Sequence, residues 1–76
     1  MLGLELIVLL KGITYVEIAK HFGIKKQSIN DWIKKGTIPE QRLEELSEFL
    51  GCPKYFLVSK VNIERLEEDL HKYLYL

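Results

Sequence analysis

Four glycines divide the first two thirds of the chain into short blocks, and this division limits the fold more than any other feature. Gly12, Gly23, Gly36 and Gly51 each follow a run in which apolar residues recur every three or four positions. This spacing is typical of an amphipathic helix, and glycine is the residue that most often follows a helix's last turn. No stretch alternates polar and apolar residues strictly enough to predict a strand. We therefore predict an all-α fold of short helices.

Each block has its own predicted limits and inward face. Thr14 is a suitable N-cap for the second block, with Glu17 three residues later completing a capping box, and Pro39 suits the first turn of the fourth block. Pro53 opens a short turn, and a longer fifth helix is predicted from about Val61 to Tyr75. The residues predicted to face the core are Leu2, Leu6, Leu9 and Leu10 in the first block, Val16, Ile18, Ala19 and Phe22 in the second, Ile29, Trp32 and Ile33 in the third, Leu43, Leu46, Phe49 and Leu50 in the fourth, and Tyr55, Phe56 and Leu57 in the turn.

The length and composition exclude several classes of protein. Seventy-six residues are enough for one domain, and the single cysteine, Cys52, suits a reducing cytoplasm and the role of a small core residue. Cys52, His21 and His71 are too few and too far apart for a zinc site, and no catalytic constellation or Gly-rich phosphate loop is present. We therefore expect no enzyme, no cofactor and no small-molecule ligand. The apolar run of residues 1–10 is interrupted by Glu5 and is far below the ~20 residues that span a bilayer, so no membrane association is expected.

The charges are distributed unevenly although they sum to zero. Residues 1–39 carry six lysines against three acidic residues, a balance of +3, and residues 40–76 carry five basic against eight acidic residues, a balance of −3. A chain polarised in this way can present a phosphate-facing end while it stays neutral overall.

The second and third blocks have the spacing of a helix-turn-helix. Ala19 lies four residues before Gly23, Ile29 lies six residues after it, and Trp32 follows three residues further on. A small residue is needed at position 19 because the following helix crosses close to it, and Gly23 makes the tight turn between the helices. Ile29 and Trp32 then seat the second helix on the first, which leaves its other face free for the major groove of DNA.

From Thr14 to Leu57 the sequence resembles the lambda-repressor and Cro-like (XRE-type) DNA-binding domains. The fragment Gln27-Ser28-Ile29 is similar to the start of the recognition helix in phage repressors of this kind. The features shared beyond the helix-turn-helix are Gly36 after the third predicted helix, the pattern Leu43-x-x-Leu46-x-x-x-Leu50-Gly51 and the closing Tyr55-Phe56-Leu57. This resemblance implies a compact five-helix lambda-repressor-like domain, with a C-terminal helix, that binds double-stranded DNA.

The third predicted helix would read bases with the side chains that its apolar face leaves outside. Gln and Asn pair bidentately with adenine, Lys reaches guanine O6 and N7, and Asp accepts from cytosine N4. A merely solvated helix face has the same composition, but Lys25 and Lys26 stand where a polar cap and acidic residues are expected. Locally unfavourable choices of this kind mark functional sites, and two cations beside exposed N–H groups suit a phosphate. The predicted base-reading residues are Lys26, Gln27, Asn30 and Asp31.

Residues around this helix are predicted to contact the DNA backbone. In the resembled family the loop after the recognition helix grips phosphates. The family also has glutamine where this chain has Tyr15, whose hydroxyl can take the same role. For Lys35, Thr37 and Arg42, solvated surface charge is the alternative. The predicted backbone contacts are Tyr15, Lys25, Ser28, Lys34, Lys35, Thr37 and Arg42.

The last predicted helix carries a heptad-like apolar stripe, with acidic residues on its other faces. It either packs on its own domain, against the apolar first helix, or forms a homodimer interface, directly or with the first helix. We predict the dimer, because one helix-turn-helix reads too few bases to be specific and two-fold dimers on palindromes are the usual remedy. The chain is thus divided into a DNA-binding domain, residues 1–58, and a dimerisation element, residues 59–76. The predicted interface residues are Ile63, Leu66, Leu70, Tyr73 and Leu74.

Together these features predict a sequence-specific transcriptional regulator, a repressor of phage or bacterial type, that reads a palindromic operator as a cytoplasmic homodimer. The alternative is a protein-interaction module, an antirepressor or adaptor that uses the helix-turn-helix fold to bind another regulator. The zero net charge and the acidic second half favour the alternative, whereas the lysines clustered around one helix favour DNA.

Overall fold

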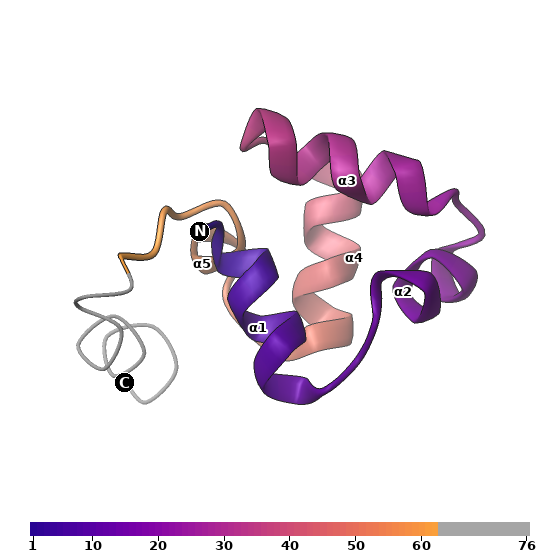
Figure 1. Cartoon of the computed structure of the whole chain (residues 1–76), viewed down its shortest axis with the longest axis horizontal. Coiled ribbons are helices and arrows are strands. Elements are labelled where there is room, and N and C mark those ends of the chain that lie inside the picture. The colour runs from indigo at the N-terminus through magenta and orange to yellow at the C-terminus, as the bar shows by residue number, and fades with distance from the viewer. Residues whose placement is uncertain (63–76) are drawn as a thin grey trace.

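The computed structural model describes residues 1–62, which form five α-helices (Figure 1). They are α1 (Gly3–Lys11), α2 (Tyr15–Phe22), α3 (Lys26–Lys35), α4 (Glu40–Leu50) and α5 (Lys54–Leu57). The predicted all-α class is confirmed, and the four longer helices end at the four predicted glycines. The predicted short turn is the helix α5. The helix predicted from about Val61 lies almost wholly outside the described residues, and Val61 and Asn62 themselves are not helical.

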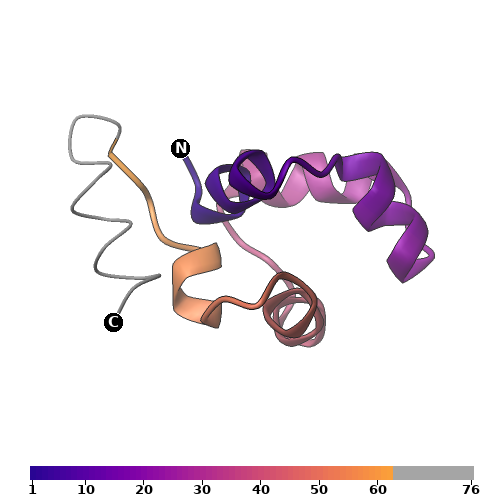
Figure 2. The ribbon, with the colours of Figure 1, turned by 90° about the horizontal axis from the view of Figure 1, so that it is seen from below.

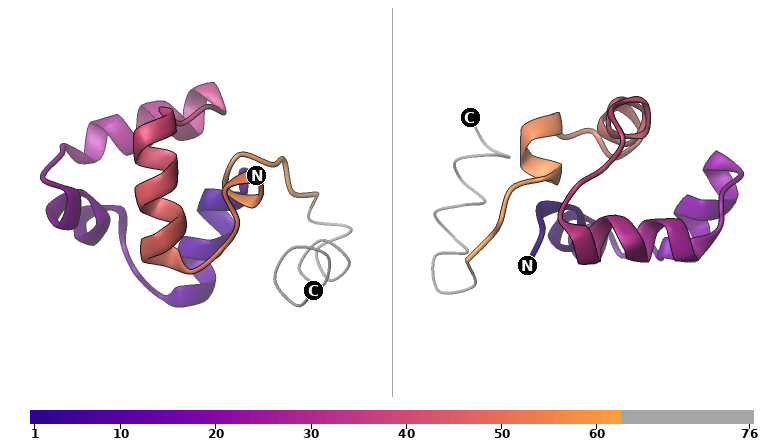
Figure 3. Two further views of the ribbon diagram at one scale, coloured as in Figure 1. Left: turned by 180° about the vertical axis from the view of Figure 1, so that it is seen from behind. Right: turned by 90° about the horizontal axis from the view of Figure 1, so that it is seen from above.

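The five helices lie in two layers (Figures 2 and 3). One layer holds α1, α2 and α3, and the other holds α4 and α5, with α4 running across α3 (Figure 1). Every helix contributes to the core, because a domain this small cannot build one from fewer elements. None of the described helices is both long enough and apolar enough to cross a membrane. The largest fully buried side chains are Leu4, Ile18, Ile29, Leu46, Leu50, Phe56 and Leu57.

The first two helices each begin with a hydrogen bond between a side chain and the backbone. In α2 the Thr14 hydroxyl accepts from the Glu17 backbone N–H at 3.1 Å and donates to the Glu17 carboxylate at 3.2 Å. The predicted cap is thus confirmed. In a full capping box, however, the Glu17 carboxylate would accept from the Thr14 backbone N–H, whereas here it accepts from the Thr14 hydroxyl. In α1 the Leu2 backbone N–H donates to the Glu5 carboxylate at 2.8 Å. That contact places a negative charge at the positive end of the helix dipole.

Several apolar side chains that were predicted to face the core lie at the surface. In α1 nearly every residue is apolar, so the spacing does not select one face, and the structure buries Leu4, Ile7 and Val8 there. Phe49 lies outside the core, and its ring stacks on that of His21 with 4.2 Å between centroids. Burial of Trp32 is also only partial. The exposed residues are Leu9, Leu10, Val16, Phe49 and Tyr55.

Cys52 is buried as predicted. Burial raises the pKa of its thiol to about 11, and the nearby Lys11 lowers it by less. The thiol therefore stays protonated at neutral pH, and a protonated thiol is a poor nucleophile.

A short backbone pairing that the sequence did not predict holds the N-terminus. The Val61 N–H donates to the Met1 carbonyl at 2.7 Å, and the Met1 ammonium donates to the Val61 carbonyl at 3.0 Å. An isolated antiparallel bridge joins Leu2 to Lys60, and the Gly3 N–H donates to the Ser59 carbonyl at 2.8 Å. The two ends of the described chain therefore lie side by side.

Candidate nucleic-acid interface

The turn between α2 and α3 determines where α3 lies. Gly23 has a φ of 64°, in the left-handed region that residues with a Cβ rarely adopt. Its N–H donates to the Lys20 carbonyl at 3.3 Å, and the Ile24 N–H donates to the Ala19 carbonyl at 3.0 Å. Both Ala19 and Ile29 are buried, so α3 is fixed on the domain by one face. Gly23 thus makes the predicted turn, and Ala19 is buried in the core.

The outer face of α3 carries the four residues predicted to read bases. Lys26, Gln27 and Asn30 are exposed, and Asp31 is half-buried. The side-chain amide nitrogen of Gln27 donates to the Asp31 carboxylate at 3.1 Å. Because that nitrogen carries two hydrogens, one donor and the amide oxygen remain available. Adenine needs one donor and one acceptor, so Asp31 can hold the Gln27 side chain in place without using up the groups that would read the base.

The start of α3 is uncapped, as predicted. Lys25 occupies the N-cap position without a side-chain cap, and the first turn has no acidic residue. The Ser28 N–H donates to the Lys25 carbonyl at 3.0 Å, which satisfies one of the first backbone donors. The positive end of the helix dipole and two lysine side chains therefore coincide at one place, an arrangement that favours an anion.

The lysines of this region carry positive charge that no carboxylate within residues 1–62 neutralises. Lys25, Lys26, Lys34 and Lys35 are all exposed and take part in neither of the ion pairs found in that part of the chain. One of those ion pairs joins Arg42 to Glu45 within α4 at 3.2 Å. A phosphate bound by Arg42 would therefore have to share the guanidinium with Glu45, whereas the α3 lysines can bind a phosphate without breaking an ion pair.

Five of the residues predicted to contact the DNA backbone lie in α3 or directly beside its ends in the chain. Lys25 and Ser28 lie at its start, with Ser28 half-buried, and Lys34 and Lys35 lie in its last turn. Thr37 is exposed in the loop that follows.

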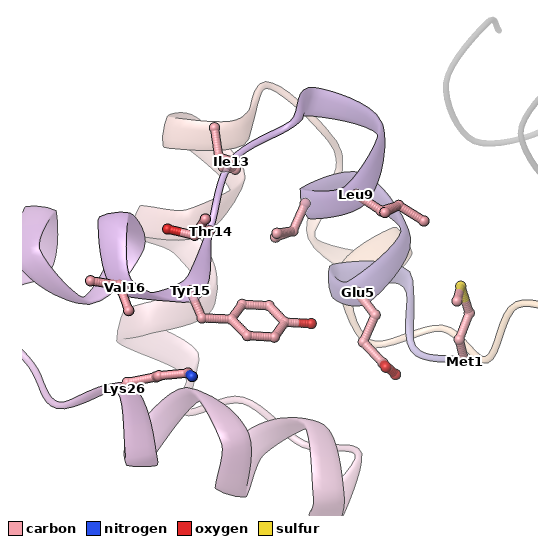
Figure 4. A pocket seen from close by; sticks show the side chains of 9 residues that line it. Met1, Glu5, Leu9, Ile13, Thr14, Tyr15, Val16 and Lys26 are labelled. Carbon is pink, nitrogen blue, oxygen red and sulfur yellow. The ribbon is translucent and has the colours of Figure 1, made fainter.

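Tyr15, the first residue of α2, lies in a groove beside the start of α3. The groove has a volume of about 560 Å³ and is lined by α1, the start of α2 and Lys26. The Tyr15 ring points across it toward Glu5 of α1 (Figure 4). Burial, and then the Glu5 carboxylate, raise the pKa of the Tyr15 phenol. The phenol is therefore protonated at neutral pH and can donate a hydrogen bond, as the predicted phosphate contact requires. In this structure, however, the ring points toward α1. Sequence reasoning missed this groove.

Comparison with known proteins gives a family match and a local relative. The sequence model of a helix-turn-helix family matches residues 4–57, well over half of the chain. Over 35 residues the chain is 52% identical to the DNA-binding transcriptional repressor RacR of Escherichia coli (strain K12). That alignment covers 46% of this chain and 22% of RacR, so the chain matches about a fifth of the length of this curated relative. No solved structure matches the chain significantly.

Proposed function

This chain belongs to the XRE-type helix-turn-helix family, and from that membership we propose that it is a sequence-specific DNA-binding transcriptional regulator. The observation that carries the proposal is the outer face of α3, which is exposed and flanked at both ends by lysines without acidic partners in residues 1–62. The relative RacR is a transcriptional repressor, which supports repression as the direction of control.

In this proposal α3 enters the major groove and its first turns contact base edges. Gln27, held by Asp31, pairs with adenine through its free amide N–H and its amide oxygen. Lys26 and Asn30 contact neighbouring bases, and the second carboxylate oxygen of Asp31 is left to accept from cytosine. The lysines at the two ends of α3 bind phosphates and fix the orientation of the helix on the duplex.

We further propose that the regulator acts in the cytoplasm as a homodimer on a palindromic operator. A single recognition helix reads few base pairs, and a two-fold dimer doubles the site that is read. The proposed interface, Ile63, Leu66, Leu70, Tyr73 and Leu74, lies outside the described residues, and its support is the apolar stripe in the sequence.

Selection of bound sites from a random DNA library tests the proposed function. The expected result is an inverted-repeat motif, together with retention on bulk DNA that weakens as salt rises. A chain that selects no motif and binds bulk DNA no better than a neutral protein would contradict the proposal. That outcome would favour the alternative function, an antirepressor or adaptor that binds another regulator in place of DNA.

Replacement of Gln27 by alanine tests the base-reading assignment. Because the exposed amide is lost while the helix stays intact, Gln27→Ala should weaken operator binding by about 1–3 kcal/mol and relax the preference at one or two base pairs. Gel-shift titrations against the selected motif and its single-base variants measure both effects. An unchanged motif and affinity would show that α3 does not read DNA through this residue.

Replacement of Lys35 by alanine tests the backbone contacts. Lys35→Ala should weaken binding to every sequence alike and reduce the dependence of affinity on salt, because one phosphate contact is lost. Lys11→Ala, which removes an exposed lysine outside the predicted contact set, is the matched control and should leave the salt dependence unchanged. If both variants have the same effect, Lys35 contributes only general charge.

A further inference from the structure

The groove beside Tyr15 gathers exposed apolar side chains around one hollow. Val8, Leu9 and Ile13 line it, and Met1, Leu9 and Val16 on its rim are 44%, 69% and 45% exposed. Leu10 is also exposed, at 52%, but does not line the groove. Scattered apolar residues are ordinary on a protein surface, whereas apolar residues gathered around one hollow mark an interaction site. A groove with this apolar lining suits the apolar face of an amphipathic helix.

The described chain ends beside this groove and points away from it. The pairing of Met1 with Val61 places Asn62 next to Met1, which lines the groove. Residues 59–61 run antiparallel to residues 1–3, and α1 continues onward from Gly3. At Asn62 the chain is therefore running past Met1, away from Gly3 and the start of α1. A following segment would have to turn back to reach Val8, Leu9 and Ile13 in the groove of its own molecule, whereas it could enter the groove of a neighbour without turning back.

The sequence that follows has the length and pattern to fill such a groove. Residues 63–76 carry apolar residues at helical intervals, including Leu66 and Leu70, with acidic residues between them. As a helix these residues would extend about 21 Å, and α1 extends about 14 Å. One face of the segment could thus cover the whole apolar length of α1.

We infer that the groove between α1 and the start of α2 receives residues 63–76 of a second copy of this chain. Each copy gives one segment and receives one, so a two-fold dimer makes every contact twice. The inference rests on the homodimer proposed above and specifies the surface that the stripe contacts. Lys26 and Tyr15 line the groove, so their proposed DNA contacts would be made from its edge, whereas Gln27, Asn30 and Asp31 do not line it.

Disulfide trapping with full-length chains tests the location. Chains carrying Leu9→Cys are mixed with chains carrying Leu66→Cys, Leu70→Cys or Tyr73→Cys, oxidised mildly, and separated under non-reducing conditions. At least one mixture should give a dimer that joins the two kinds of chain. Leu10→Cys, which is also exposed but lies outside the groove, should give none. Buried Cys52, with its raised thiol pKa, does not compete.

Other cross-linking patterns would overturn the inference. Efficient self-linking of the Leu70→Cys chain alone would mean that two stripes pair with each other. A chain that carries Leu9→Cys and Leu70→Cys and closes on itself as a monomer would mean that the segment covers its own domain. The absence of a link to position 9 from all three stripe positions would mean that the groove is not the docking site.

Sedimentation gives a second, independent measurement. Leu9→Gln should raise the dissociation constant of the dimer about tenfold to a hundredfold, because a buried apolar contact is lost in each copy. Leu10→Gln should leave it unchanged. A Leu9→Gln protein that dimerises like the wild type would contradict the inference. It would leave the proposed DNA-binding function untouched, because that function fails only if the wild type selects no DNA motif.

Discussion

Changing Leu66 and Leu70 together to Asp is expected to lower the affinity for a palindromic operator by about 10²–10⁴, because a dimer holds its second recognition helix at high effective concentration beside the second half-site. Two charges in the apolar stripe would remove the dimer and leave α3 intact. The weak affinity for a duplex with one half-site should therefore remain. Fluorescence anisotropy on the two duplexes measures both quantities.

A charge-matched control separates loss of the dimer from repulsion by DNA. Lys72→Asp changes the net charge by −2, as the double leucine variant does, but it lies off the predicted stripe. It should reduce affinity for both duplexes modestly and alike. If the double variant behaves in the same way, or if the wild type sediments as one chain both free and on DNA, the dimer is excluded.

The helix ends and the helix-turn-helix could be predicted because their causes are local. A left-handed glycine, an N-cap threonine and a small residue at a crossing act within a few positions of the chain, so Thr14, Ala19 and Gly23 show their roles in the sequence. The uncapped start of α3 was visible for the same reason. The contact between Gln27 and Asp31 is also local, since residues four apart share a helix face, although the spacing was not used to predict it.

The features that the sequence could not predict depend on distant segments. Residues 1–10 are apolar at nearly every position, so their spacing does not select a face, and packing against the rest of the domain decides that Leu4 is buried and Leu9 is exposed. The pairing of Met1 with Val61 joins positions sixty apart. The groove needs α1, the start of α2 and Lys26 in their final places. The periodicity of a sequence indicates which face of a single helix is apolar, and it carries no information on contacts between distant segments.

The close approach of α1 to α5 also depends on a residue whose role is visible only in three dimensions. Gly3, at the start of α1, lies against the backbone of Phe56. A Cβ at Gly3 would stand 1.8 Å from the Phe56 carbonyl oxygen and 2.8 Å from the carbonyl carbon. Because Phe56 is fully buried and Gly3 donates to Ser59, neither backbone can move aside without opening the core.

Gly3→Ala should therefore lower the free energy of unfolding by about 3 kcal/mol or more, at or beyond the upper end of the usual cost of overpacking. Helix propensity alone predicts that Gly3→Ala raises the free energy of unfolding, since alanine stabilises a helix by up to about 1 kcal/mol relative to glycine. Gly12→Ala is the matched control: it meets no atom within 4 Å, and its φ of 66° should cost about 1–2 kcal/mol. Urea unfolding followed by Trp32 fluorescence measures both. A Gly3→Ala protein at least as stable as Gly12→Ala would mean that α1 and α5 do not approach this closely, and α1 would then be free to bury a different face.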